Sequence, residues 1–82
     1  MKEELETVIR ENLIEIMPEL EDQSFSNEET FVDLGANSLD RGELITLTLE
    51  RIGLDISRID FVNAKTIGEL ADLIAEKRKE LN

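Results

Sequence analysis

The stretch Asp33-Leu34-Gly35-Ala36-Asn37-Ser38-Leu39-Asp40 organises the rest of the chain. It indicates a loop that ends at a helix N-terminus, because a glycine, a small residue and an amide lead into Ser38, and a helical apolar pattern begins at Leu39. A serine at such a position can cap the helix, and the free backbone N–H groups there also favour a phosphate. From the residues alone, Ser38 is therefore either a helix cap or an attachment point.

Three amphipathic segments predict long helices. The first covers residues 3–17 and ends at Pro18, since the residue before a proline avoids the helical region. The second runs from Leu39 to Ile52, with Gly53 as its left-handed C-terminal residue. The third follows a capping box of Thr66 and Glu69. The predicted core positions are Leu5, Val8, Ile9, Leu13, Ile16, Leu44, Ile45, Thr48, Leu49, Ile52, Ile67, Leu70, Leu73 and Ile74.

Two shorter segments complete the prediction. Residues 18–37 form a long polar connection, which we expect to be pinned over the helices by four apolar residues, Phe25, Phe31, Val32 and Leu34. Residues 57–62 predict one or two helical turns. The predicted fold class is all-α: a small four-helix bundle with three long helices and one short helix, forming a single domain over residues 1–82.

The composition limits the possible partners and chemistry. With 20 acidic and 9 basic residues, the net charge of −11 would repel nucleic acid and anionic membranes. The acidity is concentrated before Ser38: residues 1–37 hold eleven acids and two bases, and residues 38–82 hold nine acids and seven bases. There is no apolar run long enough for a membrane span and no signal-peptide pattern, so we expect a soluble, monomeric, cytoplasmic protein.

Catalysis and metal binding find little support in the residues. The chain has no cysteine and no histidine, so it lacks a thiol nucleophile and the commonest general base and metal ligand. Ser38 has no Ser-x-x-Lys partner. A calcium loop beginning at Asp33 would need glycine at position 38 and a bidentate acid at position 44, which are serine and leucine. No enzyme is predicted.

The motif around Ser38 resembles the serine motif of acyl carrier proteins, which bear 4′-phosphopantetheine on that serine. The resemblance lies in residues 34–40, followed by Glu43-Leu44, and in the helix order. Asn37 departs from the aspartate that most members have before the serine. The resemblance implies a carrier: a phosphopantetheinyl transferase would load Ser38 from coenzyme A, and acyl groups would be carried as thioesters on the arm.

Residues 39–45 and 63–71 look like the free-standing donor carriers of polyketide β-branching cassettes. That resemblance implies an acetyl donor for an HMG-CoA-synthase-like enzyme, served also by an acyltransferase and a decarboxylating ketosynthase. Fatty-acid carriers usually have a more acidic second helix than this one, with its Arg41 and Gly42. The residues that we expect partners to touch are Leu39, Asp40, Arg41, Gly42, Glu43, Thr46, Phe61 and Val62.

Two questions stay open from the sequence. Glycine inside a helix costs about 1 kcal/mol relative to alanine, so at Gly42 either this cost is tolerated or something approaches that face closely. The alternatives to a β-branching donor are a fatty-acid, aminoacyl or D-alanyl carrier, or an acidic helical adaptor without a prosthetic group.

Overall fold

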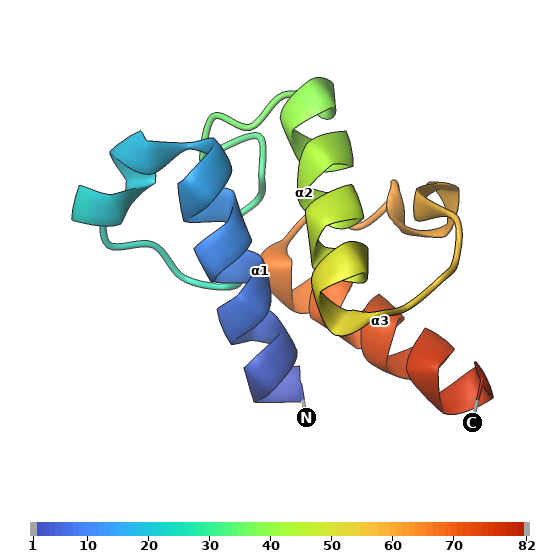
Figure 1. Cartoon of the computed structure of the whole chain (residues 1–82). Coiled ribbons are helices and arrows are strands. Elements are labelled where there is room, and N and C mark those ends of the chain that lie inside the picture. Colours follow the sequence, from blue (N-terminus) through green and yellow to red (C-terminus); the bar gives the residue numbers. More distant parts are fainter. Residues whose placement is uncertain (1, 82) are drawn as a thin grey trace.

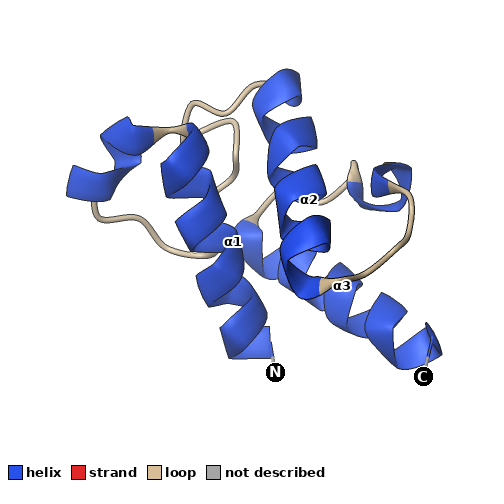
Figure 2. Ribbon diagram, in the orientation of Figure 1, coloured by secondary structure: helices blue, strands red, loops and turns tan. Residues whose placement is uncertain are grey.

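The computed structural model describes residues 2–81. In chain order its elements are the helix α1 (Lys2–Ile16), the 3₁₀-helix η1 (Pro18–Asp22), the helix α2 (Ser38–Ile52), the 3₁₀-helix η2 (Arg58–Phe61) and the helix α3 (Ile67–Leu81). Helices joined by loops make up the chain (Figure 2). The only strand-like pairing among the described residues is an isolated bridge between Thr30 and Thr66. The all-α prediction with three long helices is therefore confirmed.

The helices pack around one apolar core. α1 packs against both α2 and α3, and η2 packs against α2 and α3. Figure 1 shows α1 and α2 side by side and running in opposite directions, so that α2 begins at the end of the molecule where α1 finishes. The fully buried side chains include Ile9, Leu13, Leu44, Phe61 and Ile67. The core therefore fixes α2 between α1 and η2.

Local sequence explains where the helices end. α1 stops at Ile16, because Pro18 cannot continue it and instead opens η1, a helical turn that was not predicted. α2 ends at Gly53, whose φ of 71° is left-handed as predicted, and its N–H donates to the carbonyls of Leu49 and Glu50. The predicted short helix is confirmed in place, as the 3₁₀-helix η2 rather than an α-helix.

The long connection before α2 is held on two sides. The guanidinium of Arg10 donates to the Phe25 carbonyl at 2.9 Å and lies over the Phe25 ring, 4.1 Å from its centroid. Further along, the N–H of Phe31 donates to the Lys65 carbonyl at 2.8 Å, and the N–H of Gly68 donates to the Asn27 carbonyl at 2.9 Å. These contacts hold the loop against α1 and against the start of α3. They thereby position the end of the loop that leads into α2.

One of the four predicted loop anchors is wrong. Phe25 and Phe31 are buried and Leu34 packs against the core, but Val32 is 70% exposed. Residues 30–36 form consecutive tight turns, in which the N–H of Gly35 donates to the Val32 carbonyl and the N–H of Ala36 to that of Phe31. Phe31 occupies the inward position of these turns, so its neighbour Val32 points to solvent.

Two polar side chains are buried between α1 and α2. Asn12 and Thr48 are 4% and 0% exposed, and the Asn12 Nδ2 donates to the Thr48 Oγ1 at 3.1 Å. Arg51 on α2 pairs with Glu11 on α1 at 2.7 Å beside them. These contacts fix how α1 and α2 are aligned. Within residues 2–81, no helix has the length and apolarity needed to cross a membrane.

Candidate functional site

The cap of α2 is Asn37 and not Ser38. Asn37 has extended backbone angles, and its side-chain Oδ1 accepts from the N–H of Asp40 at 2.8 Å. The Asp40 carboxylate in turn accepts from the N–H of Asn37 at 3.1 Å, which closes a reciprocal capping box. Of the two roles that the sequence allowed for Ser38, helix cap or attachment point, the cap is excluded because Asn37 fills it.

Ser38 is the first residue of α2, and its side chain is exposed. Since the capping box satisfies the N–H groups of Asn37 and Asp40, those of Ser38 and Leu39 are left without a partner among the described residues. An accessible hydroxyl therefore stands beside free N–H donors and the positive end of the helix dipole. This environment suits a phosphate ester on the Ser38 oxygen.

A small hollow lies next to Ser38. Its volume is about 100 Å³, and its lining residues are Ser38, Arg41, Gly42, Ile45 and Val62. The first four share one face of α2, and Val62 comes from the end of η2, so the hollow forms where the two elements meet. The Arg41 Nε is buried in the molecule without a hydrogen-bond partner.

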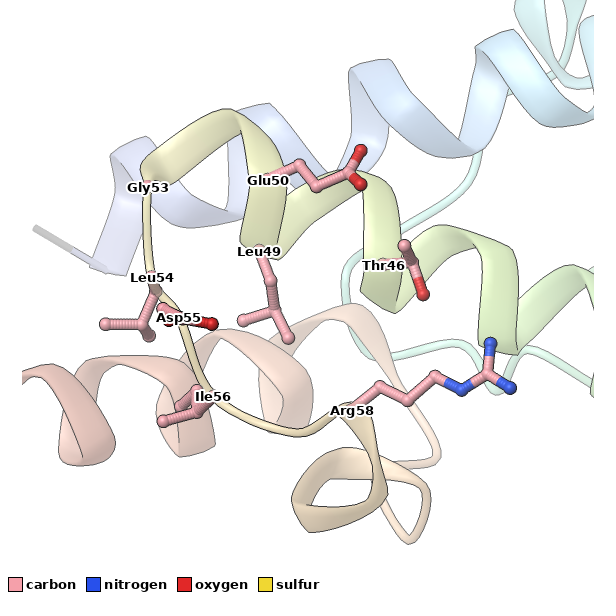
Figure 3. A pocket seen from close by; sticks show the side chains of 8 residues that line it. All are labelled: Thr46, Leu49, Glu50, Gly53, Leu54, Asp55, Ile56 and Arg58. Carbon is pink, nitrogen blue, oxygen red and sulfur yellow. The ribbon is translucent and has the colours of Figure 1, made fainter.

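Arg58 approaches the same face of α2 from η2. Its Nη1 lies 3.7 Å from the point where a Cβ on Gly42 would stand. Figure 3 shows the Arg58 side chain extending from the short helix along α2, past Thr46. The guanidinium of Arg58 therefore lies next to the backbone of α2 at Gly42, where no side chain intervenes.

A larger groove continues along α2 away from Ser38 (Figure 3). It has a volume of about 410 Å³ and lies between the C-terminal half of α2 and the segment leading into η2. Leu49, Leu54 and Ile56 give it apolar walls, and Glu50 and Arg58 add charge. Arg58 borders both this groove and Gly42, so it stands between the larger groove and the hollow at Ser38.

The structure separates the predicted partner residues into accessible and buried ones. Leu39 and Val62 are 82% and 49% exposed, Glu43 is exposed, and Asp40, Arg41, Gly42 and Thr46 are partly exposed. Phe61 is fully buried, so its prediction as a partner contact is wrong. The 3₁₀ turn directs Phe61 between α2 and α3 and leaves its neighbour Val62 outside.

Two features of η2 were not predicted. Ile59 is 71% exposed, and Arg58 reaches Gly42 from a different element. The sequence pattern of residues 57–62 gave the position of a short helix but not its rotation, because one turn is too short to define an apolar face. The contact between positions 42 and 58 has no sequence signal at all.

Titratable chemistry is sparse around Ser38. No cluster of three or more potential metal ligands occurs within residues 2–81. Among residues 2–81, the pKa of Lys2 is clearly displaced: its hydrogen bond to Asp72 raises it, with the two groups 3.1 Å apart. Lys2 stands at the start of α1, at the opposite end of the molecule from the start of α2 (Figure 1). This ion pair joins α1 to α3 and takes no part in the site.

Comparison with known proteins gives consistent matches. Residues 7–74 match the family described as a phosphopantetheine attachment site. The chain is 42% identical over 76 residues to the polyketide biosynthesis acyl-carrier protein AcpK of Bacillus subtilis (strain 168), covering 93% of both chains. It also matches a chain in the crystal structure of the curacin biosynthetic pathway HMG synthase in complex with acetyl donor-ACP. That match has a TM-score of 0.87 and 41% identity, and it covers 93% of this chain and 97% of the other.

Proposed function

Because the chain belongs to the phosphopantetheine-bearing acyl carrier family, a non-catalytic family whose cofactor is 4′-phosphopantetheine, we propose that Ser38 is the residue that carries its arm. The observation that supports this assignment is the division of roles at the start of α2. Asn37 supplies the cap, so the Ser38 hydroxyl is exposed and uncommitted beside unpartnered N–H groups. The phosphodiester of the arm carries negative charge, which these donors and the helix dipole stabilise.

The asparagine before Ser38 fits the same assignment. Its amide oxygen makes the capping bond that an aspartate would make, as the 2.8 Å contact with the Asp40 N–H indicates. The substitution removes one negative charge next to the phosphodiester. A phosphopantetheinyl transferase, using coenzyme A and its own magnesium, would attach the arm. When bound, the arm supplies a terminal thiol that holds acyl groups as thioesters.

We infer that this carrier is the acetyl donor for β-branching by an HMG-CoA-synthase-like enzyme. Two similarities support the inference: the Bacillus relative is a polyketide biosynthesis carrier, and the structural relative is the acetyl donor bound to an HMG synthase. An acyltransferase and a decarboxylating ketosynthase would provide the acetyl group. We place the carrier in the cytoplasm as a monomer, with residues 1–82 acting as one domain.

The proposed partner face surrounds Ser38. Leu39, next to Ser38 in the chain, and Val62, in the lining of the hollow, both expose apolar surface, and Glu43 and Thr46 follow further along α2. Asp40, Arg41 and Gly42 lie between them. Apolar residues that are exposed in the free protein and gathered beside the reactive arm are typical of a transient docking surface.

The experiment measures intact mass after incubation with coenzyme A and a promiscuous phosphopantetheinyl transferase. We expect the wild type and Ser24→Ala, a control at another exposed serine, to gain one arm, and Ser38→Ala to gain none while keeping its circular dichroism spectrum. A loaded Ser38→Ala protein would refute the site. Transfer of acetyl from the loaded wild type to a β-branching synthase, compared with transfer to a fatty-acid ketosynthase, then tests the donor role.

A further inference from the structure

Two arginines near Ser38 are not used to hold the fold together. Arg10 and Arg51 make hydrogen bonds or ion pairs that join different elements. Arg41 and Arg58 make neither within residues 2–81, although both approach the same face of α2. In a chain with a net charge of −11, these two arginines carry positive charges that no ion pair within residues 2–81 balances. Such a pair favours an anion that the protein chain itself does not provide.

Both arginines occupy places next to Ser38 on the helix surface. In an α-helix, the side chains that neighbour residue i are those at i+3 and i+4. Arg41 is at i+3 from Ser38 and lines the same hollow. Gly42 is at i+4 and has no side chain, and the Arg58 Nη1 lies 3.7 Å from where its Cβ would be. Arg58 therefore lies where a longer side chain at position 42 would extend, although it comes from η2 and not from α2.

The acidic groups nearby form no ion pair with these arginines within residues 2–81, although Glu50 and Asp55 line the same groove as Arg58. The Asp40 carboxylate is engaged by the N–H of Asn37 at 3.1 Å in the capping box. Arginine suits a phosphate better than lysine does, because its planar guanidinium offers paired donors and is weakly hydrated. The Nε of Arg41 is buried without a partner among the described residues, so a phosphate would be met by the terminal nitrogens of this guanidinium.

We propose that Arg41 and Arg58 clamp the phosphodiester of the arm on Ser38, and that Gly42 leaves the room in which the Arg58 guanidinium reaches it. The proposal rests on attachment at Ser38. The clamp would hold the first part of the arm at the junction of α2 and η2, beside the hollow, and leave the remainder free to reach an enzyme. It also accounts for a small residue at position 42: a methyl group would fit beside Arg58, but a larger side chain would displace it.

The test uses the loaded protein and two readouts other than activity. Phosphorus NMR reports the environment of the phosphodiester, and the difference in thermal midpoint between loaded and unloaded protein reports how much the arm stabilises the fold. The variants are Arg41→Gln, Arg58→Gln and their combination, with Arg78→Gln on α3 as a control for loss of one positive charge. A double lysine variant at positions 41 and 58 keeps the charge but not the planar guanidinium groups.

We expect loading to raise the midpoint of the wild type and of Arg78→Gln equally, and added salt to reduce the gain. The glutamine double variant should lose at least half of that gain, and its phosphorus resonance should move toward that of the urea-unfolded loaded protein. The double lysine variant should show a midpoint gain and a phosphorus resonance between those of the wild type and the glutamine double variant. Identical resonances and gains in the wild type and the glutamine double variant would overturn the clamp.

Two further outcomes distinguish the clamp from a partner-binding role of the arginines and from the proposed attachment at Ser38. If the resonance and the midpoint gain are unchanged but acetyl transfer to the synthase is slowed, the arginines face an acidic partner surface and the clamp is wrong. If the mass spectrum shows no arm on the wild type, attachment at Ser38 fails and the clamp fails with it. A shifted resonance with normal loading supports the clamp whichever enzyme receives the acyl group.

Discussion

Gly42→Ala offers a sharp test of the geometry at the start of α2. Gly42 lies inside the helix with ordinary helical backbone, since the positive φ angles among the described residues are at Gly35 and Gly53. A methyl group at position 42 would meet the Arg58 Nη1 at 3.7 Å, an ordinary van der Waals distance. The substitution should therefore bring the helix-propensity gain of about 1 kcal/mol without a steric penalty.

For a domain of this size, about 1 kcal/mol corresponds to a rise in thermal midpoint of about 4–8 °C. The assay is thermal unfolding of the unloaded protein followed by far-UV circular dichroism. Gly53→Ala is the matched control: no atom lies within 4 Å of its added Cβ, but its φ of 71° is left-handed. Its midpoint should fall, because alanine in that conformation costs about 1–2 kcal/mol.

The pair of results distinguishes backbone effects from contact effects. An unchanged or lower midpoint for Gly42→Ala would refute the reasoning, because it would mean that the methyl group does not fit beside Arg58 and that the space at position 42 is already filled. A rise for Gly53→Ala would contradict the left-handed C-terminus of α2. The expected opposite signs come from one glycine inside α2 with helical backbone and one just beyond its end with a left-handed φ.

Two other substitutions test the packing around the site. Thr48→Val should destabilise the protein by about 1–3 kcal/mol in urea unfolding, because it leaves the buried Asn12 amide without its acceptor at 3.1 Å; a cost no larger than that of an exposed substitution would contradict this reading. Phe61→Ala should cost about 3–5 kcal/mol, since Phe61 is fully buried, whereas Val62→Ala should leave stability nearly unchanged and slow only transfer to the partner enzyme. Equal stability losses at these two positions would contradict the orientation of η2 in which Phe61 is buried and Val62 is exposed.

The proposed attachment at Ser38 would also show how an acidic chain can hold an anionic arm. The acidity is concentrated in residues 1–37, where eleven acids face two bases, whereas residues 38–82 carry nine acids and seven bases. At the N-terminus of α2, position 37 is an asparagine and not an aspartate, and the Asp40 carboxylate is engaged in the cap. In the proposed site, the helix N–H groups and the two arginines would offset the net negative charge of the chain at Ser38.

The sequence by itself determined the elements and their order. Apolar residues at spacings of three and four placed all three long helices to within a residue or two, and Pro18 and Gly53 marked two of the ends. The capping box of Thr66 and Glu69 formed as predicted at the Glu69 N–H, although the Glu69 carboxylate accepts from the N–H of Lys65. These signals succeed because a helix is governed by contacts within one or two turns of the chain.

The resemblance of the motif at Ser38 also identified the family correctly. The assignment of Ser38 as a cap or an attachment point could not be made from the residues, because Asn37 and Ser38 are both good capping residues and a shift of one position exchanges their roles. The backbone angles and the Asn37–Asp40 bonds show that Asn37 is the cap, and attachment at Ser38 is our proposal.

Only the tertiary structure decided which side chains face outward near Ser38. Val32 and Phe61 were each misjudged relative to a neighbour, since a tight turn or a single 3₁₀ turn carries no repeated pattern from which its orientation can be inferred. The meeting of Arg58 with Gly42 depends on how η2 docks on α2, across fifteen intervening residues. Such contacts are set by the packing of the whole core, so local sequence signals give no indication of them.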